Sequence, residues 1–308
     1  MRELSAKLTE GVKINVIEGD NTMHLNNAER AAVLVEALPH IQNYTGKVVV
    51  IKYGGNAMIN EELKLQVMED IVLLHLIGVH VVLVHGGGPD ISGMLKRVGK
   101  ESVFKDGLRV TDKETMEIAQ MVLAGKTNKN LVNLLEVKGG KAVGISGIDG
   151  QLIKAEMNNP DLGYVGRITE VNVQPILDLI EKGYIPVVST IGCDDVGNVY
   201  NINADTAAAR IAGAMQAERL ITMTDIAGIL ADKDDPDSVI PCIDIEDAKK
   251  LFTSGVISGG MIPKVECCIE AIIEGVERVT ILDGRVPHAL LMETLTDEGA
   301  GTMVVKEK

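Results

Sequence analysis

Short apolar runs alternate with amphipathic stretches along most of the chain. Residues 48–51 and 79–84 are continuous apolar runs, which are typical of parallel strands buried on both faces. The stretch between them, from about 61 to 77, has apolar residues at helical spacing. Further strands are predicted at 142–148, 185–189, 219–223, 278–282 and 302–305. This order predicts an α/β fold, a three-layer α/β/α sandwich with a mostly parallel central sheet.

A helix is also predicted before the first strand, over residues 22–38, with Pro39 expected to end it. The sheet needs no crossover there, so this helix either caps the fold or docks on another subunit. Two hairpins are predicted, at 103–111 around Asp106-Gly107 and at 150–172. One helix is expected to follow the glycines after His85 and to end near residue 98, and another is expected from about residue 287. The remaining helices are expected at about 112–136, 175–182, 206–215, 244–252 and 263–274.

Composition narrows the class of protein. The 308 residues include 30 lysines and arginines against 44 aspartates and glutamates, a net charge of −14. Such a chain is poorly suited to DNA, RNA or an anionic membrane, and with no Trp and two Phe it offers few rings to stack on bases. No apolar run approaches the roughly 18–20 residues of a membrane span. We therefore expect a cytoplasmic enzyme without nucleic-acid or membrane partners, whose four cysteines (Cys193, Cys242, Cys267 and Cys268) stay reduced.

Glycines and lysines gather in four segments that follow or face strand ends. Glycine lets backbone N–H groups approach an anion closely, and lysine adds a mobile positive charge. Because ligands of such sheets bind beyond the carboxyl ends of the strands, these segments are expected to converge on one edge. Together they indicate a phosphate and carboxylate site, as in a small-molecule kinase. The segments are Lys52-Tyr53-Gly54-Gly55, His85-Gly86-Gly87-Gly88, Asn201-Ile202-Asn203-Ala204-Asp205 and Gly259-Gly260-Met261-Ile262-Pro263-Lys264.

Three better-known glycine motifs do not fit. Gly125-Lys126-Thr127 imitates the end of a P-loop, but Gln120 stands where the first glycine is required and the segment lies in a predicted helix. The glycines after His85 resemble an esterase oxyanion loop, yet the chain has no Gly-x-Ser-x-Gly elbow. They also lack the Gly-x-Gly-x-x-Gly spacing of a nicotinamide site.

The motifs taken together resemble the amino acid kinase family, and within it the members that act on N-acetylglutamate. The resemblance runs from about residue 45 to 308 and rests on 52–55, 85–89, 107–111, 201–205, 224–230 and 259–264. It implies ATP-dependent phosphorylation of the γ-carboxylate of N-acetyl-L-glutamate to N-acetyl-L-glutamyl 5-phosphate, the second step of arginine biosynthesis. Such a carboxylate is already ionised at pH 7, so the reaction needs charge neutralisation and in-line positioning rather than a general base.

The resemblance also implies a role for each motif. Lys52 and Lys264 would stabilise the transferring phosphoryl group, and Asp205 would orient both lysines. The alternative for Asp205 is an N-cap of the helix that follows. ATP would bring Mg²⁺, and no protein metal ligand is expected. Substrate binding is expected at Gly87, Gly88, Arg109 and Asn201, with Arg109 on the α-carboxylate, and ATP binding at Gly54, Gly55, Thr224, Asp225, Gly228, Gly260 and Met261.

A second, allosteric site is implied by the arginine-inhibited members of the family. In these members an added N-terminal helix interlaces dimers into a hexamer and helps to form an L-arginine site, and residues 22–38 provide such a helix here. Glu298 is expected to pair with the guanidinium, although Glu298-Gly299 could also be only a polar turn. The expected arginine-binding residues are His288, Glu298, Gly299 and Gly301.

The expected organisation is therefore an N-terminal extension and helix at 1–44, an acetylglutamate-binding lobe at 45–195 and an ATP-binding lobe at 196–308. Hairpin 150–172 looks shorter than in many family members, and the first twenty residues have no assignable counterpart. Two alternatives remain open. One is a sibling kinase acting on another acid, such as acetylaminoadipate or glutamate, because one methylene in a pocket is worth only about 1–3 kcal/mol. The other is a non-catalytic arginine sensor. A nitrogen-signalling partner protein is left undetermined.

Overall fold

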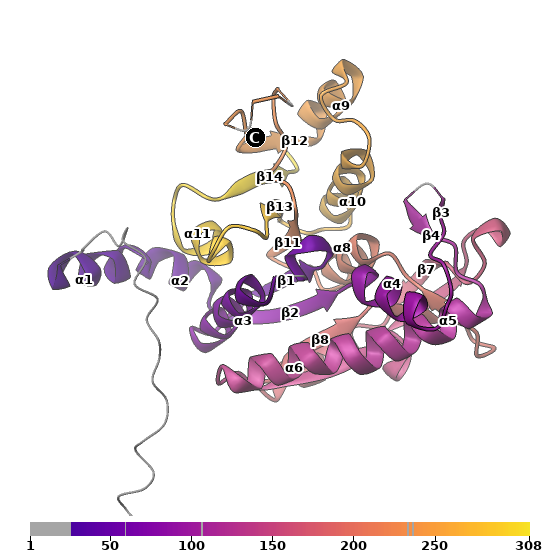
Figure 1. The fold of residues 1–308 in the computed structure, drawn as a ribbon. Coiled ribbons are helices and arrows are strands. Elements are labelled where there is room, and N and C mark those ends of the chain that lie inside the picture. Colours follow the sequence, from indigo (N-terminus) through magenta and orange to yellow (C-terminus); the bar gives the residue numbers. More distant parts are fainter. Residues whose placement is uncertain (1–25, 59, 106, 233, 236) are drawn as a thin grey trace, which may run out of the picture. The chain divides into compact units, whose positions relative to one another are not determined.

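The computed structural model describes residues 26–308 except 59, 106, 233 and 236 (Figure 1). The chain divides into two compact units, residues 1–38 and 39–308. In the first unit α1 (Asn27–Glu36) begins at a capping box, in which Asn26 accepts from the Glu29 N–H and the Glu29 carboxylate accepts from the Asn26 N–H. The predicted start of this helix at residue 22 lies outside the described residues.

The prediction that Pro39 ends the first helix was wrong. Helix α1 ends at Glu36, and Pro39 lies in the first turn of α2 (Leu38–Tyr44). A first-turn position suits proline because its missing N–H would have no intrahelical partner there. The proline therefore begins a second helix that leads to the first strand.

The central sheet has eight strands in the described part of the chain, in the order β12-β14-β13-β11-β1-β2-β8-β5. The strands from β13 through β11, β1, β2 and β8 to β5 pair parallel, each with its neighbour in the sheet. Strand β13 pairs antiparallel with β14. The mostly parallel α/β fold is thus confirmed. The strands are β1 Val48–Tyr53, β2 His80–His85, β5 Ala142–Ser146, β8 Ile185–Ser189, β11 Arg219–Thr224, β12 Cys242–Asp244, β13 Arg278–Asp283 and β14 Gly301–Val305.

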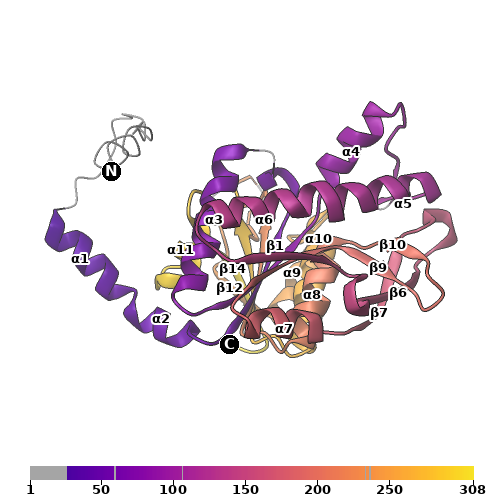
Figure 2. The same ribbon diagram turned by 90° about the horizontal axis from the view of Figure 1, so that it is seen from below.

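Helices cover both faces of this sheet (Figure 2). Alternate residues of β1 enter two different apolar cores: Val49 and Ile51 lie in one, and Val50 lies in the other. That alternation explains why the strand is apolar throughout. The first core includes residues of α3 (Glu61–Leu76), α6 (Asn128–Val137) and α11 (Ala289–Leu295), and the second includes residues of α7 (Gln174–Glu181), α8 (Ala204–Ala214), α9 (Ile245–Ser254) and α10 (Met261–Ile273).

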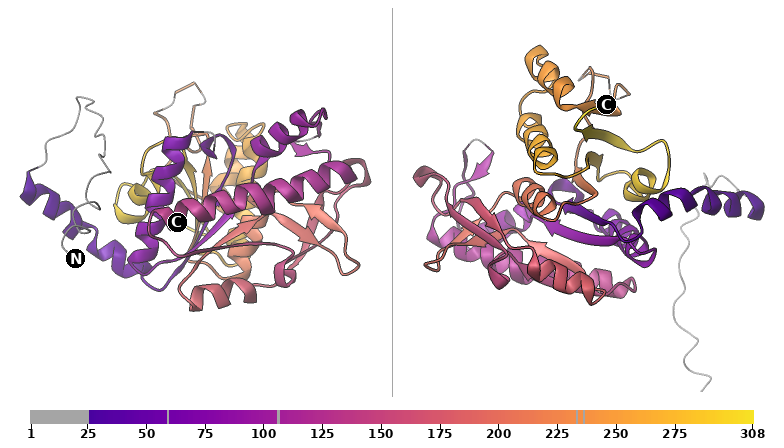
Figure 3. Two further views of the ribbon diagram at one scale, coloured as in Figure 1. Left: turned by 60° about the horizontal axis from the view of Figure 1, so that its bottom comes forward. Right: turned by 180° about the vertical axis from the view of Figure 1, so that it is seen from behind.

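A second sheet of four strands lies beside the first (Figure 3), in the order β10-β9-β6-β7. The predicted hairpin 150–172 forms β6 (Ile153–Met157) and β7 (Gly166–Val171), which pair antiparallel. Two short strands that were not predicted, β9 (Ile191–Cys193) and β10 (Val199–Asn201), complete this sheet. The hairpin predicted at 103–111 is confirmed as β3 (Phe104–Lys105) and β4 (Leu108–Arg109).

The long helix predicted at 112–136 is continuous but changes its winding. It consists of α5 (Lys113–Gln120), a π-helical segment η2 (Met121–Thr127) and α6. This helix packs beside α4 (Gly88–Arg97), which starts at the last glycine of the second motif. Single-turn 3-10 segments complete the described elements: η1 Gly55–Met58, η3 Asp149–Gln151 and η4 Pro160–Leu162.

The parallel strands place the predicted motifs at one edge of the central sheet. In the register of β1, Lys52 lies opposite Thr222 of β11, and Tyr53 lies opposite His85 of β2. The glycine turns after β1 and β2 and the residue Thr224 at the end of β11 therefore lie on the same side of the sheet, at the carboxyl ends of neighbouring strands. Among the residues described, no helix is long and apolar enough to cross a membrane. The two-lobe boundary at 195 stays a prediction.

Candidate active site

One carboxylate joins two lysines from distant parts of the chain. Lys52 is buried near the end of β1, and its Nζ lies 2.9 Å from Oδ1 of Asp205 in the first turn of α8. Lys264, in the first turn of α10, places its Nζ 3.6 Å from Oδ2 of the same carboxylate. Burial by itself raises the pKa of Asp205, but the two ammonium groups outweigh it, so the pKa lies below its usual value. Both lysines are thus held near an ionised carboxylate.

The alternative role of Asp205 as an N-cap is excluded, because Asn203 takes that position. Asn203 is the N-cap of α8, and its Oδ1 accepts hydrogen bonds from the N–H groups of Asp205 at 2.9 Å and of Thr206 at 3.0 Å. Because Asn203 satisfies the helix end, the carboxylate of Asp205 can be used for the lysines.

Lys52 opens into a cavity of about 210 Å³ at the carboxyl ends of β1 and β2. This substrate cavity, as we call it below, brings together the predicted Gly87, Gly88, Arg109 and Asn201. Gly54 and Gly55, which were assigned to the ATP side, line it too. Asn201 approaches Thr111, with its Nδ2 3.4 Å from the threonine hydroxyl. Glycine backbone and two cations thus surround a small polar space.

Arg109 is buried without a carboxylate partner in the described part of the chain. Its Nη1 donates to Ser102 Oγ at 2.7 Å, and its Nη2 donates to Ser92 Oγ at 2.9 Å and to the Gly88 carbonyl at 3.0 Å. Its guanidinium also lies over the Phe104 ring, 4.7 Å from the centroid. Burial lowers the pKa of Arg109, but a guanidinium stays charged in proteins. A fixed, uncompensated positive charge of this kind is suited to binding an anion.

A second cavity, of about 670 Å³, lies on the other side of Asp205 and is lined by Lys264, Gly260 and Cys267. Met261 begins α10 next to it. Burial and the charge of Asp205 raise the pKa of the Cys267 thiol to about 11, even though Thr206 bonds to its sulfur, so it is not a nucleophile at neutral pH. Asp205 therefore lines one cavity while its partner Lys52 lines the other.

The remaining residues assigned to ATP lie after β11. Thr224 ends the strand, and its hydroxyl accepts from the Ile226 N–H at 3.1 Å; Asp225 follows in an exposed position. Gly228 is buried with φ 146°, and a Cβ there would lie 2.6 Å from the Thr302 hydroxyl. Packing alone thus explains why a glycine stands at position 228, because any side chain there would collide with β14.

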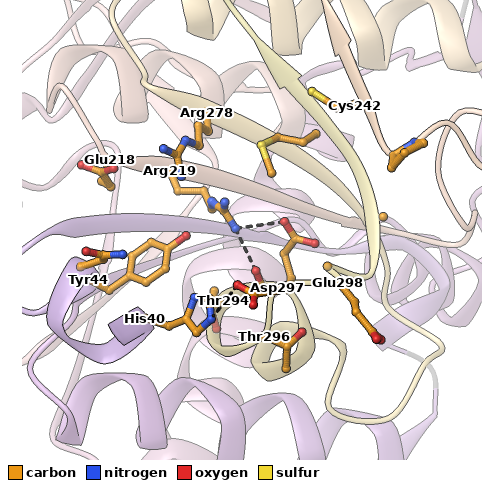
Figure 4. Close-up of a pocket in the computed structure, with 16 residues that line it drawn as sticks. His40, Tyr44, Glu218, Arg219, Cys242, Arg278, Thr294, Thr296, Asp297 and Glu298 are labelled. Carbon is orange, nitrogen blue, oxygen red and sulfur yellow. Dashed lines mark hydrogen bonds and ion pairs between the residues drawn. The ribbon is translucent and has the colours of Figure 1, made fainter. Parts of the chain in front are cut away.

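The residues predicted to bind arginine do not all meet. Glu298, Gly299 and Gly301 line a cavity of about 540 Å³ (Figure 4). It is called the allosteric cavity below, after the site that was predicted from these residues. His288 is not among its lining residues: its Nδ1 lies 2.6 Å from Oδ1 of the buried Asp70 in α3. Sequence reasoning missed the buried ion pair of this cavity, in which Arg219 Nη1 lies 3.0 Å from Glu293 Oε1. The ion pair could have been suspected from Arg219, a charged residue at the start of the otherwise apolar strand β11.

Among the residues that the structure describes, no three His, Cys, Asp or Glu side chains gather as metal ligands.

Comparison with known proteins gives one consistent result. A profile of the amino acid kinase family matches residues 47–283. Acetylglutamate kinase of Caldanaerobacter subterraneus subsp. tengcongensis is 55% identical over 280 residues, which cover 90% of this chain and 94% of that protein. Acetylglutamate kinase of Brachyspira hyodysenteriae is 56% identical over 286 residues, which cover 92% and 99%.

Solved structures agree with this result. N-acetylglutamate synthase from Neisseria gonorrhoeae, in complex with coenzyme A and N-acetyl-glutamate, is similar with a TM-score of 0.78 and 26% identity. That similarity covers 90% of this chain and 64% of the synthase.

Proposed function

This chain belongs to the amino acid kinase family, and from that premise we propose that it transfers the γ-phosphoryl group of ATP to the γ-carboxylate of N-acetyl-L-glutamate. The products are N-acetyl-L-glutamyl 5-phosphate and ADP, and the step belongs to arginine biosynthesis. The observation that carries the proposal is the placement of Lys52 and Lys264 on the two oxygens of Asp205, next to the substrate cavity.

The reaction needs no proton transfer. One oxygen of the ionised γ-carboxylate attacks the γ-phosphorus of ATP, the bond from that phosphorus to the β–γ bridging oxygen breaks, and ADP leaves with the electron pair. Negative charge on the equatorial oxygens must be neutralised as this happens. Lys52 approaches from the acceptor side and Lys264 from the donor side, and Asp205 keeps both ammonium groups in place.

Arg109 binds the α-carboxylate of the substrate. Its position is fixed by Ser92, Ser102 and the Gly88 carbonyl, none of which cancels its charge. A planar guanidinium pairs with a carboxylate in a bidentate manner, which fixes the direction of the substrate as well as its affinity. Asn201 and the N–H groups of the glycine turn, which line the same cavity, complete the contacts.

ATP binds on the α10 side of Asp205. The first turn of α10, with Gly260 before it, offers the positive end of a helix dipole to the phosphates. Mg²⁺ comes with the nucleotide as part of the substrate and neutralises phosphate charge, since this ion usually keeps water and substrate phosphates as ligands. Thr224 and Asp225 lie at the neighbouring strand end, where the nucleoside can reach them.

The test is ADP release from MgATP with a panel of acids: N-acetylglutamate, N-acetylaminoadipate, N-acetylaspartate and glutamate. We expect N-acetylglutamate to give at least tenfold higher kcat/KM than any other acid. A higher kcat/KM for another acid would mean that this acid, and not N-acetylglutamate, is the substrate. If no acid gave ADP release while L-arginine still bound, the chain would be a non-catalytic arginine sensor.

The allosteric cavity supports a second proposal, feedback inhibition by L-arginine. The Glu298 carboxylate is exposed at its rim and, among the described residues, forms no ion pair or hydrogen bond, so it can accept a guanidinium. The other walls carry Glu218, Asp297 and the Arg219–Glu293 pair. Initial rates measured with increasing L-arginine test this proposal, and unchanged rates at millimolar L-arginine would contradict it.

We also propose a homo-oligomer, up to a hexamer, and a cytoplasmic location. In α1 the side chains of Val33, Leu34 and Val35 are 54%, 75% and 68% exposed. Three adjacent exposed apolar residues on a helix favour burial against another copy of the chain. Free thiols at all four cysteines support a reducing compartment.

A further inference from the structure

His85 ends β2 directly before the glycine turn and is completely buried. Its two ring nitrogens each have one partner. Nδ1 lies 2.8 Å from the carbonyl oxygen of Gly86, and Nε2 lies 3.1 Å from Nδ2 of Asn128. Burial lowers the pKa of His85 to about 4, so the ring is neutral at physiological pH and carries one proton.

The partners decide which nitrogen carries that proton. Nδ2 of Asn128 also faces the carbonyls of Val187 at 2.9 Å and Ile145 at 3.3 Å, and Lys129 Nζ donates to Asn128 Oδ1 at 3.1 Å, so the amide orientation of Asn128 is fixed. The Gly86 carbonyl oxygen can only accept, so Nδ1 of His85 must carry the proton and donate it there. The unprotonated Nε2 then faces the donor amide of Asn128.

The central sheet fixes the first member of this relay, by which we mean the contacts from Asn128 to His85 and from His85 to the Gly86 carbonyl. Asn128 begins α6 and reaches the carbonyl of Val187 in β8 because β5 carries Gly144 beside it. A Cβ at Gly144 would lie 1.9 Å from Asn128 Oδ1, so only glycine leaves room for the amide. The space is thus shaped for Asn128.

The consequence for the glycine turn follows from the planar trans peptide. Within one trans peptide the C=O and the next residue's N–H point in opposite directions. The Gly86 carbonyl is turned to the buried ring, and the Gly86 N–H is donated to the Tyr53 carbonyl at 3.1 Å. The Gly87 N–H therefore points away from His85, on the side of the substrate cavity, and has no acceptor in the described part of the chain.

We propose that His85, held in the Nδ1–H tautomer by Asn128, is a positioning residue that fixes the Gly86–Gly87 peptide and so aims the Gly87 N–H at the reacting oxygens. This role rests on the kinase activity proposed above. A peptide between two glycines has few steric barriers to flipping, and a flip would replace a donor by a carbonyl oxygen facing an anion. The hydrogen bond from His85 stabilises the arrangement in which the donor faces the ligand before the ligand arrives.

Variants of His85 test the role. His85→Leu keeps the volume roughly and removes the donor, whereas His85→Asn can return an N–H near the place of Nδ1. Removing one oxyanion donor usually lowers kcat by about 10²–10³, and loosening it lowers kcat by less. We expect a kcat about 10–100-fold lower in His85→Leu, KM values for both substrates within about threefold, and recovery to within about threefold of the wild-type kcat in His85→Asn.

The matched control is His80→Leu, at the other end of the same strand and outside the substrate cavity. It is expected to leave kcat unchanged. Equal losses in His85→Leu and His85→Asn, a kcat of folded His85→Leu within twofold of the wild type, or a change confined to thermal stability would each overturn the proposal.

A measurement on the unmodified protein keeps the proposal testable if the variants fail to fold. In protein labelled with 15N-histidine and 15N-glycine, the ring nitrogens of His85 should show the Nδ1–H tautomer from pH 6 to 8, and the Gly87 amide should shift when N-acetylglutamate is added. The Nε2–H tautomer would overturn the relay. A chain that makes no acyl phosphate would overturn the kinase function instead, so the two failures are distinct.

Discussion

The Nζ of Lys52 lies 2.9 Å from Oδ1 of Asp205, and this contact joins the end of β1 to the start of α8. The second oxygen of the same carboxylate faces Lys264, 3.6 Å away. Only 7% of the Lys52 side chain and 19% of the Asp205 side chain are exposed, so solvent screens the pair weakly. One carboxylate therefore links the lysines that line the two cavities.

Asp205→Asn is predicted to lower kcat about 100-fold, because the amide keeps the size of the side chain but no longer holds two ammonium groups. The fold should persist, since Asn203 rather than Asp205 caps α8. Steady-state kinetics and circular dichroism check both parts. The control is Asp247→Asn, which removes a surface carboxylate paired with Lys250 and Lys308. A kcat within threefold of the wild type would contradict the organising role of Asp205.

Arg109→Lys is predicted to raise the KM for N-acetylglutamate about 10–100-fold and to leave the KM for ATP unchanged. Lysine keeps the charge but cannot form the bidentate pair with the α-carboxylate. Arg97→Lys, on the exposed part of α4, provides the control. If the KM for ATP rose instead, Arg109 would belong to the nucleotide side.

Long periodic elements could be predicted from the sequence, whereas three short strands could not. Strands such as β1 and β2 are apolar on both faces, which marks them clearly. Strands β9, β10 and β12 have three residues each, too few to show a period, and they form because neighbouring strands pair with them. Pro39 was misread because a proline can end one helix or begin the next.

The site was predictable as a set of motifs, but not in its detailed contacts. The motifs placed Lys52 and Asp205 at the same sheet edge, yet the sequence left open whether Asp205 orients the lysines or caps the helix that follows, and the structure shows Asn203 as the N-cap of α8. The partners of Arg109, Ser92 and Ser102, carry no signal of their own and are brought together by α4 and the segment before β3. His288 was grouped with Glu298 by resemblance, while the structure pairs it with Asp70.

Glu298→Gln is predicted to weaken inhibition by L-arginine about tenfold or more while leaving kcat and both KM values unchanged. The amide removes the charge that would pair with the guanidinium, and the residue lines the allosteric cavity rather than the substrate cavity. Dose–response curves for L-arginine measure the effect. Glu307→Gln, an exposed change near the C-terminus, is the control. Unchanged inhibition would remove Glu298 from the arginine site.

Asp70→Asn is predicted to stabilise the protein at pH 8 by up to about 2–3 kcal/mol, with a smaller gain at pH 5. Burial raises the pKa of Asp70 to about 6, against the lowering effect of the hydrogen bond from His288. A carboxyl group with a raised folded-state pKa stabilises the fold when protonated, and this contribution is lost as the pH rises from about 4 through 6. Urea unfolding at both pH values checks it. A lower stability of the variant at pH 8 would contradict it.

Leu34→Glu is predicted to reduce the size of the oligomer, because a charge on the most exposed of the three apolar residues of α1 opposes burial against another copy. Light scattering after size-exclusion chromatography measures the mass. Glu36→Gln, in the same helix, is the control. An unchanged mass with Leu34→Glu would show that α1 does not hold the assembly together.

The most direct test of the account uses N-acetylglutamate labelled with 18O only in its γ-carboxylate. The product is trapped with hydroxylamine, which attacks the acyl carbon and releases phosphate with the former bridging oxygen. The account predicts N-acetylglutamyl hydroxamate and an equal amount of phosphate that carries one 18O atom. Unlabelled phosphate without hydroxamate would mean that water, not the γ-carboxylate, attacks ATP, and it would contradict the proposed reaction.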